Sequence, residues 1–126
     1  MSYKITNCTF SSSRSLTNGG AIALSNMPNV EISSTTIFNN SAKVNGGAIF
    51  FYCDNFGLNY EVCSLKIKNT TFKGNRADQE GGAIKWNFYE PQMSGINFVD
   101  NKAGIYGDNI AAVAKKLVQV TLDDAL

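Results

Sequence analysis

The sequence predicts an all-β protein, a parallel β-helix (a single-stranded β-solenoid) of about four rungs. Three observations predict this fold class: a recurring four-residue motif, an upstream pattern in register with it, and a repeat too short to contain a helix. The motif is Gly-Gly-Ala-Ile at residues 46–49, repeated at 19–22 and 81–84, with a degenerate Gly-Asp-Asn-Ile at 107–110. Internal repeats of this kind mark a chain made of stacked, similar structural units.

The pattern upstream of each motif has a constant spacing. An apolar residue is followed by Asn three positions later, by Ala two positions after that, and by Gly four positions further on. The three clear copies are Ile37, Asn40, Ala42 and Gly46; Phe72, Asn75, Ala77 and Gly81; and Phe98, Asn101, Ala103 and Gly107. The first copy has diverged and consists of Phe10, Ser13, Ser15 and Gly19.

The repeat length decides how the strands pair. The motif glycines Gly19, Gly46, Gly81 and Gly107 are 27, 35 and 26 residues apart. A unit of this length holds two or three short strands, and similar units stack best in parallel, like on like. We therefore expect one domain over 1–126, with repeats at about 5–31, 32–66, 67–92 and 93–112 and a terminal strand or cap at 113–126. Neither terminus resembles a cap, so we expect a segment of a longer solenoid.

Each unit begins with a β-prone run interrupted by a polar residue and continues to a strand that starts after the glycines. The first runs are 5–10, 32–37, 67–72 and 93–98, and the later strands are 21–24, 48–52 and 83–88. Side chains alternate across a strand. Ile49 and Phe51 are therefore expected to face inward, and Phe50 outward.

The recurring polar residues and glycines have structural explanations. Stacked Asn side chains can donate and accept hydrogen bonds along the stack, and Asn tolerates the left-handed backbone of a corner. The predicted ladder is Asn40, Asn75 and Asn101. Glycine suits a corner with positive φ or a close approach of two backbones. The predicted corner glycines are Gly19, Gly20, Gly46, Gly47, Gly81, Gly82 and Gly107.

The second unit is longer by eight residues, and cysteines flank the excess. Cys53 and Cys63 are expected to form a disulfide at the base of a loop, which would indicate an oxidising compartment; the alternative is two unpaired thiols. Cys8 is expected to be a small inward-facing filler. Asn39 begins a glycosylation sequon and is the expected acceptor if the chain is secreted.

Outward aromatic residues on or near the insertion form the candidate contact surface. They are Phe50, Tyr52, Phe56, Tyr60 and Tyr89. Exposed aromatic side chains suit a protein contact or sugar stacking. The alternative is that the insertion folds over and buries them.

Composition argues against several function classes. The formal net charge is +1 and there are no histidines. These values give no electrostatic case for nucleic-acid binding, and they exclude the usual catalytic triads and most zinc sites. The ten acidic residues do not recur at matching repeat positions, whereas glycoside hydrolysis needs converging carboxylates. We therefore expect no enzyme activity, no cofactor and no metal site. No run of apolar residues is long enough to insert into a membrane, and the N-terminus does not resemble a signal peptide.

The Phe-x-x-Asn-x-Ala and Gly-Gly-Ala-Ile pattern resembles the polymorphic outer membrane proteins of chlamydiae over about residues 5–112. Tyr-Gly-Asp-Asn-Ile-Ala at 106–111 is similar to a repeat ending in pectin-lyase-like surface proteins of ciliates. The resemblance implies a right-handed β-helix and a non-enzymatic structural or adhesive module at a cell surface or outside the cell. Its partners would be proteins, neighbouring solenoid units or a surface glycan. The alternatives are a carbohydrate-active β-helix with its catalytic residues outside this segment, and a scaffold component of a larger assembly.

Overall fold

The structure is a computed structural model that describes residues 2–54 and 63–114. The first rung contains β1 (Tyr3–Thr6), β2 (Thr9–Ser11), β3 (Arg14–Ser15) and β4 (Ile22–Ser25). The second contains β5 (Val30–Ser33), β6 (Thr36–Phe38), β7 (Ser41–Ala42) and β8 (Ile49–Tyr52). The third contains β9 (Leu65–Lys68), β10 (Thr71–Lys73), β11 (Arg76–Ala77) and β12 (Ile84–Phe88). The fourth contains β13 (Gln92–Ser94), β14 (Asn97–Val99), β15 (Lys102–Ala103) and β16 (Ile110–Ala114).

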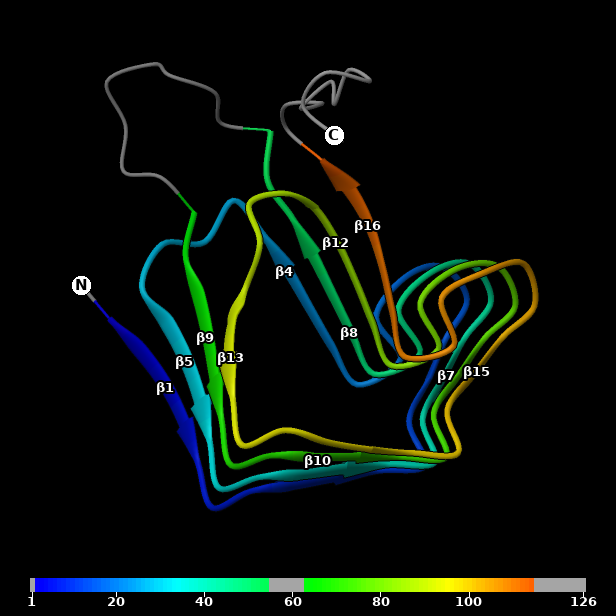
Figure 1. Cartoon of the computed structure of the whole chain (residues 1–126), viewed down its shortest axis with the longest axis horizontal. Coiled ribbons are helices and arrows are strands. Elements are labelled where there is room, and N and C mark those ends of the chain that lie inside the picture. The colour runs from blue at the N-terminus through cyan, green and yellow to red at the C-terminus, as the bar shows by residue number, and fades with distance from the viewer. Residues whose placement is uncertain (1, 55–62, 115–126) are drawn as a thin grey trace, which may run out of the picture.

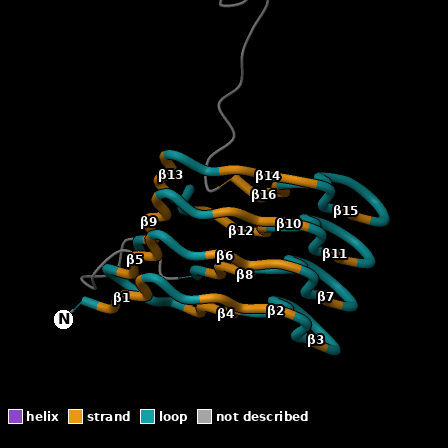
Figure 2. Tube along the Cα trace, turned by 90° about the horizontal axis from the view of Figure 1, so that it is seen from below, coloured by secondary structure: helices purple, strands orange, loops and turns teal. Residues whose placement is uncertain are grey.

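The strands form four parallel sheets, each with one strand from every rung. Sheet A contains β1, β5, β9 and β13; sheet B contains β2, β6, β10 and β14; sheet C contains β3, β7, β11 and β15; and sheet D contains β4, β8, β12 and β16. Figure 1 shows the chain passing through the sheets in this order in every rung, and Figure 2 shows the rungs stacked. The predicted all-β parallel β-helix of four rungs is therefore confirmed.

The interior is a set of columns of like side chains. In sheet D, Ile22, Ile49 and Ile84 lie directly above one another and are buried. In sheet A, Ile32 and Ile67 pair in the same way and are fully buried. Each such side chain contributes about 1.5–3 kcal/mol to folding through burial. Repeated apolar positions therefore define the inside of the helix.

A sharp corner separates sheet A from sheet B. The run expected over 5–10 is two strands, because β1 ends at Thr6 and β2 begins at Thr9. The residue after each sheet A strand has positive φ, and these residues are Asn7, Ser34, Asn69 and Gly95. The polar interruptions in the sequence are thus the left-handed turns at this corner.

A second corner, between sheets B and C, contains the stacked asparagines. Asn40 Nδ2 donates to Asn75 Oδ1 and Asn75 Nδ2 donates to Asn101 Oδ1, each at 3.0 Å. The Asn40 and Asn75 backbone amides donate to the same oxygens. These three side chains are buried. One detail of the sequence interpretation is wrong: the left-handed residues at this corner precede the stacked positions and are Ser12, Asn39, Gly74 and Asp100.

The paired glycines divide two roles between them. The first of each pair, and Gly107, has positive φ of 69° to 76°. The second has no Cβ because the next rung leaves no room for one: a Cβ on Gly47 would collide with the carbonyl oxygen of Gly82. The same collision occurs between Gly20 and Gly47, and between Gly82 and Asp108. The second glycine therefore sets how closely consecutive rungs approach.

The environment of Cys8 also differs from the prediction. It was expected to face inward, but it is an exposed free thiol. Its sulfur contacts the Thr6 carbonyl oxygen at 3.3 Å, as Thr35 and Thr70 hydroxyls contact the carbonyls two residues before them at 2.8 Å. Those two threonines are buried. Cys8 lies in the first of the described rungs, and its backbone amide donates to the Thr35 hydroxyl of the next rung at 3.4 Å.

Candidate functional site

The outer face of sheet D carries the aromatic residues nearest to the insertion. Phe50 and Tyr52 project from β8 with ring centroids 6.1 Å apart and planes at 14°, a stacked arrangement. Both side chains are half-buried. In the first rung the same positions hold Ala23 and Ser25. The second rung therefore carries a stacked aromatic pair where the first rung has small side chains.

Lys85 lies beside this aromatic pair, in the rung above Phe50. Although it is on the outer face of the sheet, it is only 6% exposed. Its ammonium forms an ion pair with the Glu80 carboxylate and lies 5.8 Å from the centroid of the Tyr106 ring. The hydrogen bond from Lys85 holds the pKa of Glu80 below its usual value, against a smaller opposing effect of burial. The cation is thus fully engaged within the protein.

Two further hydrophobic side chains extend the surface toward the fourth rung. Tyr106 is 47% exposed and pairs through its backbone with Glu80, while Val113 is 44% exposed. We call Phe50, Tyr52, Tyr106 and Val113, with Lys85 between them, the sheet D face. Sequence reasoning did not assign Tyr106 to a contact surface. The sequence feature that could have indicated Tyr106 is the residue before the degenerate fourth motif. Tyr106 occupies there the position that Asn45 and Glu80 occupy in the second and third rungs.

The disulfide lies at the end of β8, next to the sheet D face. Cys53 and Cys63 are bonded to each other and both are buried. The Cys53 amide donates to Asn87 Oδ1 at 2.7 Å, and the Asp54 amide donates to Asn26 Oδ1 at 2.9 Å. Side chains from the rungs above and below therefore hold the first residues of the insertion, so its base is fixed to the β-helix.

The remaining predicted site residues lie in different places. Tyr89 is half-buried and packs against the hydrophobic core rather than standing free. Phe56 and Tyr60 lie outside the described residues. Asn39 is exposed in a left-handed turn, with its side chain close to Gly74 of the next rung. Of the predicted contact residues that the structure describes, Phe50 and Tyr52 are brought together as a stacked pair.

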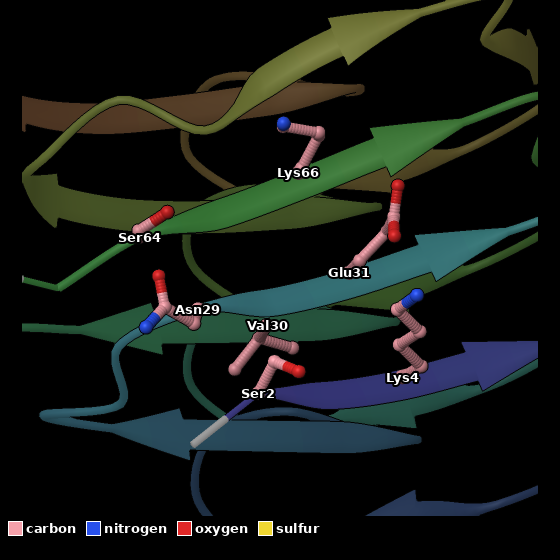
Figure 3. Close-up of a pocket in the computed structure, with 7 residues that line it drawn as sticks. All are labelled: Ser2, Lys4, Asn29, Val30, Glu31, Ser64 and Lys66. Carbon is pink, nitrogen blue, oxygen red and sulfur yellow. The ribbon is translucent and has the colours of Figure 1, made fainter.

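A shallow hollow of about 190 Å³ lies on the outer face of sheet A, next to titratable groups. Figure 3 shows Lys4, Glu31 and Lys66 on adjacent strands at its edge. Glu31 forms an ion pair with Lys68 at 3.1 Å, and this hydrogen bond lowers the pKa of the Glu31 carboxyl. A carboxylate held ionised by a neighbouring cation is not suited to donate a proton near neutral pH. Among the described residues, the hollow therefore offers no general acid, since its carboxylate is already paired with a lysine.

Among residues 2–54 and 63–114, no three His, Cys, Asp or Glu side chains gather as a metal site would require. The same part of the chain has no helix long and apolar enough to cross a membrane.

The four stacked parallel sheets define a class of protein, the parallel β-helix repeat proteins. Within that class, the Chlamydia polymorphic membrane protein (Chlamydia_PMP) repeat matches residues 34–52 and 69–85. The matched segments run from the corner after sheet A, through sheets B and C, into sheet D. The predicted resemblance to polymorphic outer membrane protein repeats is therefore confirmed. No curated protein and no solved structure matches the chain.

Proposed function

We propose that this chain is a non-enzymatic structural or adhesive module of a cell-surface or extracellular protein and that it makes contacts through the sheet D face. The observation that carries the proposal is the coincidence of two features. The polymorphic membrane protein repeat covers residues 34–52, and the last residues of that match include the stacked Phe50 and Tyr52. Half-exposed aromatic pairs provide a large contact area at low conformational cost.

The disulfide supports the location. A bond between Cys53 and Cys63 persists in oxidising surroundings and is rare in the cytosol. Asn87 and Asn26 fix the backbone at its base, so residues entering the insertion start from a rigid platform. A rigid base lowers the entropy lost when a neighbouring surface binds a partner.

The charged groups support a non-enzymatic role. Retaining and inverting glycosidases need two carboxyl groups facing a common substrate. Of the described carboxylates, Glu31, Asp78 and Glu80 are each within ion-pair distance of a Lys or Arg. Asp108 accepts a hydrogen bond from a backbone amide. Each of these four acids is thus engaged with a different partner.

The location is tested on intact cells that express the protein. Lysine biotinylation with a membrane-impermeant reagent should label the chain as strongly in intact cells as in lysed ones. Peptide mapping without reduction should recover Cys53 linked to Cys63. Labelling only after lysis, together with free thiols, would favour the intracellular scaffold alternative.

The contact surface is tested with beads coated with the purified chain and applied to the same intact cells. The substitutions Phe50→Ala and Tyr52→Ser place in the second rung the residues that the first rung already has. Bead retention should fall to the level of uncoated beads. The control is Phe38→Ser, which removes a half-buried aromatic side chain from the outer face of sheet B, where the first rung has Ser11. Equal loss with the control would contradict the proposal. Pretreating the cells with protease or with periodate separates a protein partner from a glycan.

A further inference from the structure

The outer face of sheet C carries a column of cations that the proposed contact surface does not use. Register places Arg14 beside Ser41, Ser41 beside Arg76, and Arg76 beside Lys102. Three of four consecutive rungs therefore present a cation at one position. With about 4.8 Å between rungs, Arg14 and Arg76 are roughly 10 Å apart and Lys102 follows one rung later. Lys43 adds a fourth cation two residues after Ser41.

Three of these cations, Arg14, Lys43 and Arg76, line a groove on the surface. A groove of about 430 Å³ lies over the lower three rungs and is lined by Arg14, Ser41, Ala42, Lys43, Arg76 and Asp78. Figure 1 shows sheet C, here β7 and β15, between the corner after β10 and the loops that lead into sheet D. Lys102 continues the same column in the fourth rung. The groove therefore runs along the stack, across the strands.

The cations in the groove are scarcely neutralised. The nearest acid in it is Asp78, whose carboxylate is 3.9 Å from Arg76 Nε, and both side chains are more than half exposed. Among the described residues, no ion pair involves Arg14, Lys43 or Lys102. The hollow on sheet A differs, because there Glu31 stands between Lys4 and Lys66 and pairs with Lys68. Within the described part of the chain, sheet C thus carries cations without ion pairs, although the whole chain is nearly neutral.

We propose that this groove binds a linear sulfated polysaccharide laid along the stack. An extended chain with anionic groups at regular intervals matches a column of cations repeated rung by rung. Two of the four cations are arginines, whose planar guanidinium groups bind tetrahedral oxyanions through paired N–H groups. Hydroxyl groups of the sugar can bond to Ser41 between the two arginines.

The groove is less suited to a nucleic acid. Sites for single strands combine cations with aromatic side chains on which bases stack. No aromatic residue lines this groove. Duplex binding is driven by neutralising many phosphates at once, and four cations on one narrow face are few for that purpose.

The test is binding of the whole chain to dextran sulfate, with uncharged dextran of the same length as the reference, measured by calorimetry or surface plasmon resonance. The groove variant is Arg76→Ser with Lys102→Ser, which copies the natural Ser41 in the same column. The control variant is Lys4→Gln with Lys66→Gln, which copies Gln92 in the corresponding column of sheet A. Both variants lose two positive charges on exposed side chains.

We expect dextran sulfate to bind and dextran not to bind. The groove variant should bind about tenfold more weakly, the factor that follows from losing two surface charge contacts. The control variant should bind as the unmodified chain does, and affinity should fall as salt is raised. Circular dichroism establishes that both variants are folded.

Three results would overturn the proposal: no binding of dextran sulfate, equal weakening in both variants, or a single-stranded oligonucleotide of equal charge binding as tightly and being lost with the same variant. Equal weakening would mean that net charge, not the groove, is responsible. The inference stands apart from the sheet D face, since the Phe50→Ala, Tyr52→Ser variant should keep its affinity for dextran sulfate whatever it does to bead retention.

Discussion

Asp108 Oδ1 accepts a hydrogen bond from the backbone amide of Ala103 at 3.0 Å. In the three lower rungs the position of Asp108 is the second glycine of the motif, which must lack a Cβ because the next rung lies against it. Ala103 belongs to β15, at the outer edge of sheet C, whereas the equivalent residues of β7 and β11 have strands on both sides. The side chain of Asp108 therefore uses the space at this edge to satisfy an amide of an edge strand.

Asn109, the residue after Asp108, likewise accepts a hydrogen bond, here from the last of the stacked asparagines. Asn101 Nδ2 donates to Asn109 Oδ1 at 3.2 Å, and Asn109 replaces the alanine of the motif. Asn101 is the last member of the column among the described residues, and this bond is made within its own rung. In the fourth motif, Asp108 and Asn109 thus supply polar side chains that bond to groups of their own rung.

Substitution by alanine should cost much more at the second glycine of a motif than at Asp108, which occupies the same position in the fourth rung. Gly47→Ala should destabilise the protein by about 3 kcal/mol or more, because the new methyl group meets the Gly82 carbonyl oxygen and the rungs must separate. Asp108→Ala should cost only about 1 kcal/mol, the value of one hydrogen bond. Urea unfolding followed by circular dichroism measures both. A larger cost at Asp108 than at Gly47 would contradict the account of the second glycine.

Removing the central stacked asparagine should be among the most damaging single changes. Asn75 accepts from Asn40 and donates both to Asn101 and to the Ile37 carbonyl, all in a buried environment. Asn75→Ala should destabilise by about 3 kcal/mol, since partners on both sides lose bonds that water cannot replace. Asn97→Thr is the control: Asn97 is exposed, and Thr71 stands at that position in the rung below. It should change the free energy of unfolding by less than about 0.5 kcal/mol.

The Glu80–Lys85 pair should make stability depend on pH. The pKa of Glu80 is lowered in the folded protein, so its contribution is present above the usual carboxyl value of 4.5 and is lost as pH falls through the lower folded value. Unfolding free energies measured between about pH 7 and about pH 3 should therefore fall less steeply in Glu80→Gln than in the unmodified chain. Parallel curves for the two proteins would mean that the pair contributes nothing.

Lys85 should be replaceable by an apolar side chain only when the charge of Glu80 is removed at the same time. It is 6% exposed, so Lys85→Ala leaves Glu80 without its partner and exposes the side of Phe50, at a cost of about 2–3 kcal/mol. Lys85→Met with Glu80→Gln removes both charges and keeps the volume, and should recover most of that loss. Thermal unfolding of the three proteins checks the order. Failure of the double variant to recover would show that the ion pair adds net stability.

The disulfide should stabilise the chain and Cys8 should not. Cys53 and Cys63 are ten residues apart, and a ring of that size contributes about 2–3 kcal/mol. Replacing both by Ser should lower the melting temperature by several degrees, and adding a reductant to the unmodified chain should have the same effect. Cys8→Ser removes an exposed thiol and should leave the melting temperature unchanged. A reductant effect that persists in the double serine variant would point to another cause.

Much of the fold could be predicted because the same contact is made in every rung. The isoleucine column, the glycine pairs and the apolar position before each asparagine recur at 26 to 35 residues, and such a period marks like-on-like stacking. The fold class followed from these positions alone, since parallel stacking is the arrangement that lets identical side chains satisfy one another.

The tertiary structure alone decided the contacts that occur once. Lys85 is buried beside Glu80 and Tyr106, and Cys8 is exposed although Thr35 and Thr70 at the equivalent position are buried. Neither feature recurs from rung to rung, so neither appears in the sequence as a period. The cation column of sheet C became visible only when the register, including the eight-residue insertion, placed Arg14, Arg76 and Lys102 at the same position of their rungs, with Ser41 between the two arginines. A contact that is repeated is written into the sequence as a period, whereas a contact between unlike residues of neighbouring rungs exists only once the rungs are stacked.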